Sequence, residues 1–392
     1  MDERLETKKL TVWTRNFTIL FISNCIINFG HSIIMYLLNG YLITIGIAST
    51  AIGFIVSMFS FAALGFRPFS GPLIDGWNKK KLYMIMLVII ITSYVGYSFS
   101  HSLPLIILSR FLHGLGQGCI SALSMAMAGD ALPKEKLSSG MSLYVIGSVV
   151  AGAISPALGL SLMERFGYSY AFLLPLILLA IALVLSSFLE HSFVPGTKIR
   201  FTLSGMICKA AIVPAVLVLL SGIVRIGIST YLVEFITNVR HVEGMKVYYY
   251  VNAAAMILSR PFFGRLTDKK GLHISLIPSY VFFALSLVAT AFCRSTWQLM
   301  LVAVLNALGY GTAFSSQQAM CVKVAPPELR GAASNTSFVG LDIGEMIGPI
   351  MFGALLNIVD YSTMFLILLI PLAISALLLL IWAPKHLDLL KP

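Results

Sequence analysis

Four charged residues interrupt long apolar stretches of this chain: Arg110, Arg225, Asp342 and Glu345. A charge in hydrocarbon costs at least about 2.5–3.5 kcal/mol on insertion scales, so these residues are expected to face a partner or a water-filled cavity. Asp342 and Glu345 are three residues apart, which places them on one helical face. A carboxyl that alternates between dry and wet surroundings can exchange a proton, and an arginine fork can hold an anionic group. For each residue, a static structural ion pair is the alternative.

Uncharged polar side chains form stripes in the same apolar stretches. Asn24, Asn28 and His31 recur on one helical face, and a histidine can carry a proton near neutral pH. Hydrogen-bonded contacts between helices would explain this stripe equally well. If the stripes line a shared cavity, the predicted substrate-binding residues are Asn24, Asn28, His31, Arg110, Arg225, Tyr231, Asn306, Tyr310, Gln317 and Asp342. For the run Tyr248–Tyr250 we favour anchoring at the membrane interface.

The composition around these residues indicates a membrane protein. Hydrophobic residues make up 58% of the 392 residues and charged residues 11%, against about 25% charged in soluble domains. The apolar residues form blocks of about 20, the length of a membrane-spanning helix, without the alternation of a barrel strand. Basic residues that flank the spans explain the net charge of +11, so no nucleic acid is expected. The five cysteines have neither disulfide nor metal spacing, and we expect no cofactor or metal.

The blocks predict an all-α membrane protein with twelve transmembrane helices. The predicted units are an N-terminal segment 1–16, a six-helix bundle 17–189, a linker 190–206, a second six-helix bundle 207–383 and a tail 384–392. The predicted spans are 17–39, 47–69, 82–100, 104–127, 139–163, 169–189, 207–237, 244–263, 273–293, 297–322, 332–357 and 362–383.

Basic residues set the expected orientation, because they accumulate on the cytoplasmic side of membrane spans. With the N-terminus in the cytoplasm, the basic residues on the outer side are only Arg165, Arg240, Lys246 and Arg294. Apart from the two arginines inside spans, the rest of the 27 basic residues fall on the inner side. Both termini and the central linker are therefore predicted to be cytoplasmic.

The two bundles are copies of each other. A shift of 193 residues, the separation of Arg67 from Arg260, carries much of one half onto the other. The matched sets are Arg67-Pro68-Phe69, Gly71 and Asp75 with Arg260-Pro261-Phe262, Gly264 and Asp268; and Gly147, Pro156 and Tyr168 with Gly340, Pro349 and Tyr361. Six spans separate the copies, so the repeat is parallel and predicts a central cavity between the halves.

At these residues the chain resembles the major facilitator superfamily, and within it the twelve-helix drug:proton antiporters, over roughly residues 15–385. Gly71–Lys80 resembles the family loop pattern Gly-x-x-x-Asp-Arg/Lys-x-Gly-Arg/Lys-Arg/Lys, with Asn78 in place of the second glycine, where asparagine tolerates a left-handed turn. Gly264–Gly271 fits the front of the same pattern. Arg110–Gly116 resembles Arg-x-x-Gln-Gly-x-Gly, and Gly348-Pro349 resembles the Gly-Pro of the antiporter signature.

The resemblance implies a proton-coupled secondary transporter that works by alternating access, in a bacterial plasma membrane and as a monomer. Its gate would include Gly71, Asp75, Gly264, Asp268 and Arg330. Glu345 is the favoured proton carrier, and Asp342 is expected to contact substrate or to pair with Arg225. The expected partners are protons, lipid and a small amphipathic, anionic or zwitterionic substrate that is exported. Import of an organic anion and lipid flipping remain alternatives, and the absence of nucleotide-binding or catalytic motifs argues against an enzyme.

Overall fold

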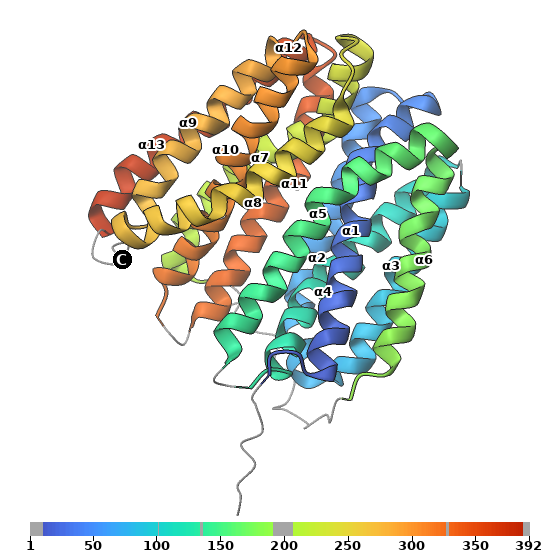
Figure 1. The fold of residues 1–392 in the computed structure, drawn as a ribbon, viewed down its shortest axis with the longest axis vertical. Helices are drawn as coiled ribbons and strands as arrows, with labels where there is room; N and C mark the ends of the chain where they lie inside the picture. Colours follow the sequence, from blue (N-terminus) through green and yellow to red (C-terminus); the bar gives the residue numbers. More distant parts are fainter. Residues whose placement is uncertain (1–10, 101, 134–135, 191–206, 327–328, 387–392) are drawn as a thin grey trace, which may run out of the picture.

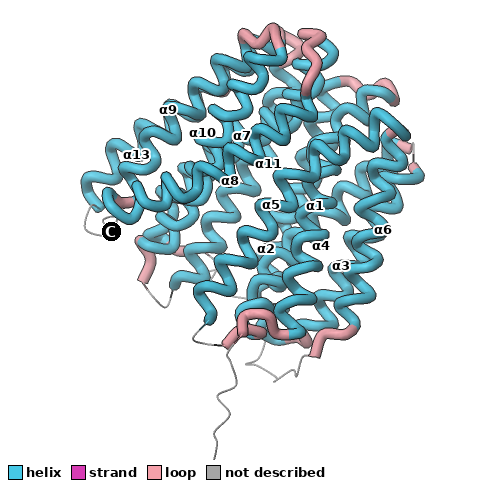
Figure 2. Tube along the Cα trace, in the orientation of Figure 1, coloured by secondary structure: helices cyan, strands magenta, loops and turns pink. Residues whose placement is uncertain are grey.

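The structure is a computed structural model that describes residues 11–100, 102–133, 136–190, 207–326 and 329–386. The regular structure of these residues is helical (Figure 2). The helices of the first half are α1 (Arg15–Thr44), α2 (Ser49–Gly76), α3 (Lys79–Phe99), α4 (Leu103–Asp130), α5 (Leu137–Phe166) and α6 (Tyr168–Ser187). Those of the second half are α7 (Ile212–Glu234), α8 (Met245–Lys270), α9 (Leu272–Ala291), α10 (Thr296–Lys323), α11 (Arg330–Leu355), α12 (Tyr361–Ile367) and α13 (Leu369–Trp382).

The helices form two bundles that lie side by side, the first coloured blue to green and the second yellow to red in Figure 1. Eleven stretches of the described chain are long and apolar enough to cross a membrane. α8 takes the twelfth place, packed against α10 of its own bundle and α5 of the other. The last crossing is divided at Leu368, between α12 and α13. The predicted twelve-helix architecture in two repeats is confirmed.

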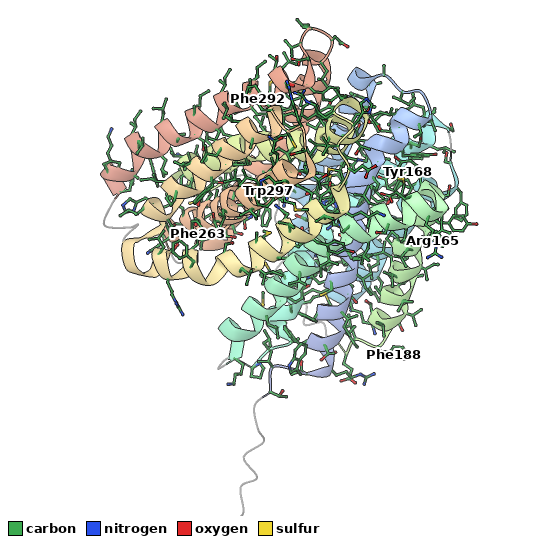
Figure 3. The ribbon with its side chains drawn as sticks, turned by 45° about the horizontal axis from the view of Figure 1, so that its top comes forward. Arg165, Tyr168, Phe188, Phe263, Phe292 and Trp297 are labelled. Carbon is green, nitrogen blue, oxygen red and sulfur yellow. The ribbon has the colours of Figure 1, made fainter. Side chains whose placement is uncertain are left out.

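The bundle has two ends, which we call the near end and the far end. The near end is where α1 begins and α6 ends, and the far end is where α1 ends and α8 begins. The sequence predicts that the near end is cytoplasmic. The turn between α5 and α6 lies at the far end, where Gly167 has φ of 87° and is flanked by Arg165 and Tyr168 (Figure 3).

Equivalent helix starts in the two halves are built differently. Gly271 precedes α9 with φ of 89°, a backbone conformation that glycine adopts without steric cost. The equivalent Asn78 precedes α3 with φ of −64°, and its side chain accepts a hydrogen bond from the Lys81 amide at 3.0 Å. Asn78 therefore does not use the left-handed conformation that asparagine tolerates. The asparagine replaces glycine because its side chain caps the first turn of the next helix.

Several helices run beyond their predicted spans. α2 was expected to end at residue 69 but continues to Gly76, so the first part of the segment predicted as a loop forms the last turns of that helix. α8 likewise continues to Lys270. Hydropathy marks where the hydrocarbon ends, whereas a helix can continue into water with its backbone hydrogen bonds intact. Only Trp77 and Asn78 separate α2 from α3.

A glycine face on α11 fixes the positions of the two acidic residues. A Cβ at Gly340 or Gly344 would collide with the α7 backbone at Ala215 or Leu219, so the two helices approach closely along this face. The glycine-rich face of this span therefore serves close helix packing. Asp342 and Glu345 lie between and beside these glycines, one able to reach across to α2 and the other to α7.

Three pairs of helices carry the contacts between the halves. α2 packs along α11, α5 along α8, and α1 against α7. At the far end, the Asn39 amide donates to the Thr230 carbonyl and Lys246 pairs with Glu164. A Cβ at Gly53 would collide with the carbonyl of Pro349. The halves are thus joined at the far end.

Candidate transport cavity

A cavity of about 320 Å³ lies between the two halves. Its walls come from α1 and α5 of the first half and from α7, α8 and α10 of the second. Of the ten predicted substrate-binding residues, five line it: Asn28, His31, Arg225, Asn306 and Tyr310. Phe314, Ser315 and Gln318 continue the α10 wall toward the near end. The side chains that the sequence assigned to separate stripes thus share one cavity.

One part of the cavity wall is aromatic. The rings of Tyr36 and Tyr249 are 5.0 Å apart, and Tyr248 meets Tyr249 at 5.2 Å. Tyr310 stacks on Phe314 at 5.6 Å. Interfacial anchoring is therefore wrong for Tyr248 and Tyr249, which are buried at the cavity wall. α8 turns these two residues toward the cavity and others away from it. A run of three tyrosines in the sequence does not show which of them faces the cavity.

Arg225 is the one formally charged side chain among the described residues that line the cavity. It donates a hydrogen bond from Nη2 to Glu345 Oε1, and its guanidinium lies 5.9 Å from the centre of the Tyr310 ring. The Arg225 side chain is 19% exposed, whereas that of Glu345 is 6% exposed. The arginine therefore presents its charge to the cavity and the glutamate neutralises it from behind.

Asp342 does not pair with Arg225, which corrects one of the two expectations for it. Its carboxylate accepts a hydrogen bond from Nε of Arg67, and both side chains are 7% exposed. Arg67 also lies 5.0 Å from the centre of the Phe338 ring. Asp342 is also absent from the cavity lining. The two acids on α11 therefore differ: Asp342 joins the halves, and Glu345 serves the second half alone.

The first-half wall contains a buried cluster behind the cavity surface. Arg110 on α4 is 1% exposed, and it lies 5.1 Å from the centre of the Phe59 ring. Its Nη2 donates to the Val56 carbonyl at 3.3 Å and contacts Met35 Sδ at 3.6 Å. The rings of His31 and His113 are 5.4 Å apart. Arg110 therefore lies behind His31 and Met35, which themselves line the cavity.

The remaining predicted binding residues make structural contacts. Asn24 donates to Ser148 Oγ, a cavity residue. The Tyr231 hydroxyl donates to the Pro349 carbonyl at 3.1 Å. Gln317 donates to Ser221 and Tyr280 at 2.8 and 2.9 Å. For the predicted gate, the structure describes the backbone but not the side chains, so the roles of Gly71, Asp75, Gly264, Asp268 and Arg330 stay predictions.

Residues that the sequence did not single out also line the cavity. Tyr36, Ser148 and Asn252 lie in apolar segments without a charged neighbour on the same face. Arg67 was placed among the cytoplasmic basic residues, yet it forms the buried pair with Asp342. The sequence feature that could have identified Arg67 is its position inside an apolar block, eight residues before Asp75 of the loop motif.

A membrane bundle of two like halves around a central polar and aromatic cavity defines a solute transporter. The family model of the Major Facilitator Superfamily matches residues 20–292 and 248–391. The chain belongs to the Major Facilitator Superfamily and is a multi-pass protein of the bacterial plasma membrane.

Two relatives with assigned names resemble the chain over most of their length. The "Multi-drug resistance efflux pump PmrA homolog" of Lactococcus lactis subsp. lactis (strain IL1403) is 26% identical over 374 residues, with 90% of this chain and 91% of that protein covered. The "Multidrug resistance protein MdtG" of Salmonella heidelberg (strain SL476) is 22% identical over 373 residues, with the same coverage.

Solved structures share the fold at lower identity. A peptide-bound POT family transporter superposes with a TM-score of 0.80 at 15% identity, covering 96% of this chain and 97% of its own. A variant of the nucleoside transporter NupG gives a TM-score of 0.78 at 15% identity, covering 93% and 98%. These likenesses establish the fold.

Proposed function

We propose that this protein exports a small amphipathic, zwitterionic organic molecule in exchange for protons by alternating access. The observation that carries the proposal is the Arg225–Glu345 ion pair, whose arginine faces the cavity and whose carboxylate lies behind it. The aromatic wall offers an apolar surface to the body of the substrate, and the amides of Asn28 and Asn306 offer polar contacts. The names of the two relatives, an efflux pump and a multidrug resistance protein, support export.

The ion pair relates the charge of the substrate to the direction of proton movement. Glu345 and an anionic group on the substrate both bind Arg225, so they compete for it. Protonation of Glu345 removes its charge and leaves Arg225 to the anionic group. By linkage, each of the two events then favours the other. A purely anionic substrate would therefore travel together with the proton.

A zwitterion has the opposite effect on the proton. Its anionic group binds Arg225 and draws the guanidinium away from Glu345, and its cationic group takes the place of the guanidinium beside the Glu345 carboxylate. The cation and the proton now compete for one carboxylate, which is the relation that an antiporter requires. Within the predicted substrate class, export by exchange thus favours the zwitterionic over the anionic members.

The second candidate function is uptake of an organic anion together with a proton. The same ion pair favours it, because loss of the Glu345 charge would free Arg225 for the anion. Asp342 is occupied by Arg67, so it is not the group that exchanges with either substrate. The two candidates share a cavity and a coupling residue and differ in the sign of the coupling.

Proteoliposomes separate the candidates. The purified protein is reconstituted with a pH-sensitive dye inside, and zwitterionic, anionic and cationic amphiphiles are added outside without a membrane potential. We expect the zwitterion to drive protons in the opposite direction to itself. Movement of protons in the same direction as an anionic substrate would establish the second candidate, and substrate flux without proton movement would exclude both.

Because the halves are joined at the far end, the orientation of the protein in the membrane decides which side the cavity faces. With the near end cytoplasmic, as the basic residues predict, the cavity of this structure would be closed to the outside and would face the cytoplasm. An exporter loads its substrate in that state. Protease accessibility of the Lys391 tail in sealed inside-out vesicles tests the orientation on which this step depends.

A further inference from the structure

We propose that Arg110 forms a binding site for a small monovalent anion of the chloride class, separate from the Arg225 site. The side chain is 1% exposed, and within the described part of the chain no carboxylate oxygen lies within 4 Å of it. A buried ion without a counter-ion is costly, because its lost hydration is not replaced by an opposite charge. The first half therefore holds a positive charge that the described protein groups do not neutralise.

The groups around Arg110 are suited to an anion. Nε and Nη1 of Arg110 have no hydrogen-bond partner, and neither do Nδ1 of His31 and Nε2 of His113. A neutral imidazole carries one N–H, which can donate to an anion. The Tyr97 hydroxyl lies beside the guanidinium and within 3.5 Å of Nδ1 of His113. Four helices, α1, α2, α3 and α4, thus contribute residues to the surroundings of this buried guanidinium, and three of these residues carry groups that can donate to an anion.

Met35 marks the route by which an ion would reach this site. Its sulfur, a weak acceptor, lies 3.6 Å from Nη2 of Arg110, while the residue also lines the cavity. Methionine is unbranched and has three rotatable bonds, so its sulfur can be exchanged for an anion by a change of rotamer. Arg110 itself is absent from the cavity lining, so an anion would reach it through the place that the Met35 sulfur occupies, a place too small for the body of an organic substrate.

The site is distinct from the one proposed for substrate. Arg225 already has Glu345 as its counter-ion and contributes to the second-half wall. His31 is close enough to interact electrostatically with both Arg110 and Arg225, so it lies in the wall between the two sites. The anion site requires neither a proton gradient nor a transported substrate, so its test is independent of the proposed transport function.

Thermal unfolding of the full-length protein in detergent tests the site. Chloride replaces gluconate at constant ionic strength, without substrate. Because a ligand that binds only the folded state stabilises it by mass action, we expect a saturable rise of a few degrees in the transition temperature. Arg110→Met should abolish the rise. Arg165→Met is the matched control, because this exposed arginine (Figure 3) lies 5.3 Å from the centre of the Phe166 ring, close to the 5.1 Å between Arg110 and the Phe59 ring.

Two outcomes would overturn the proposal: no chloride-dependent rise in the wild type, or an equal rise in Arg110→Met. If Arg110→Met does not fold, Arg110→Lys takes its place, and we expect it to need several times more chloride for half of the rise. Crystals of the wild type grown in bromide provide a measurement that needs no variant. We expect an anomalous peak beside the Arg110 guanidinium, and bromide sites elsewhere with none at Arg110 would contradict the proposal.

Discussion

The same pair of positions carries an ion pair in one half of the molecule and no charge in the other. The repeat shift of 193 residues places Ser32 opposite Arg225, and Gly152 opposite Glu345. Ser32 and Gly152 also face each other, since a Cβ on Gly152 would lie 3.1 Å from Ser32 Oγ. Both line the cavity. The repeat therefore preserves the geometry of the contact between the first and fifth helices of each bundle, while the charge was placed in one half.

This comparison separates scaffold from chemistry. The features that repeat include glycines and prolines, which set how closely helices pack and where they bend, together with Arg67 and Asp75 of the loop motif. The features that do not repeat are Arg110, Arg225, Asp342 and Glu345. A carrier with one exchange site needs one coupling group. After duplication of the scaffold, the second half could therefore carry the ion pair while Ser32 and Gly152 of the first half stayed uncharged.

The largest effect is expected when the ion pair loses its acid. Glu345→Gln keeps the shape but leaves Arg225 charged at all pH values, so the proton loses its binding site. We expect gradient-driven accumulation in proteoliposomes to disappear while exchange of labelled for unlabelled substrate persists. The control is Asp130→Asn, which breaks the exposed pair with Lys79, for which we expect an effect of about 1 kcal/mol or less. Normal pH-dependent uphill transport by Glu345→Gln would place the coupling elsewhere, and His31 would be tested next.

The next effect concerns the arginine of the same pair. Arg225→Lys keeps the positive charge but loses the planar fork that binds a carboxylate in two places. We expect substrate affinity to fall about tenfold, which corresponds to about 1.4 kcal/mol, and to fall further in Arg225→Met. Binding is measured by isothermal titration in detergent. If both variants bind as the wild type does, Arg225 only neutralises Glu345.

The sequence was sufficient for the fold and for the existence of a site. Twelve apolar blocks and one constant repeat shift determine a membrane bundle of two like halves, because a bilayer leaves the backbone few alternatives. The charged residues inside spans were identified for the same reason. Each is costly in lipid, so its presence predicts a partner or a cavity.

Pairing could not be predicted in the same way. Asp342 and Glu345 are three residues apart on one face, and the sequence offered Arg225 as a partner for Asp342. Which acid meets which arginine depends on the rotation of α11, and that is fixed by Gly340 and Gly344 against the α7 backbone. The hydropathy of the span does not report this rotation. The same limit explains why the Tyr248–Tyr250 run was assigned to the interface.

A smaller effect is expected at the ion pair that joins the halves. Asp342→Asn and Arg67→Met each remove the pair between α2 and α11, which should favour the conformation that is open at the far end. The readout is labelling of a cysteine at Gln318, which lines the cavity toward the near end, with Cys25 replaced by serine. We expect labelling to slow by about three- to tenfold, in the range of typical conformational couplings.

The double variant shows whether the two residues act as a pair. If they do, Asp342→Asn combined with Arg67→Met should slow labelling no more than either single change, because the interaction can be lost only once. Additive effects would mean that each residue acts through other contacts. Unchanged labelling in all three proteins would show that the pair persists in both conformations and does not select between them.

The smallest effect is expected at the neutral counterpart of the ion pair. Ser32→Ala removes one hydroxyl from the first-half wall, so we expect at most about a tenfold loss of affinity, the upper end of the worth of a neutral hydrogen bond, and an unchanged number of protons per substrate. Gly152→Ala introduces a Cβ at 3.1 Å from Ser32 Oγ and should lower the thermal transition slightly. In the double variant the oxygen is gone, so the transition should recover toward that of Ser32→Ala alone. A change in the number of protons per substrate in any of these variants would show that the first-half wall takes part in coupling. The conclusion that only the second half carries the coupling residues would then be wrong.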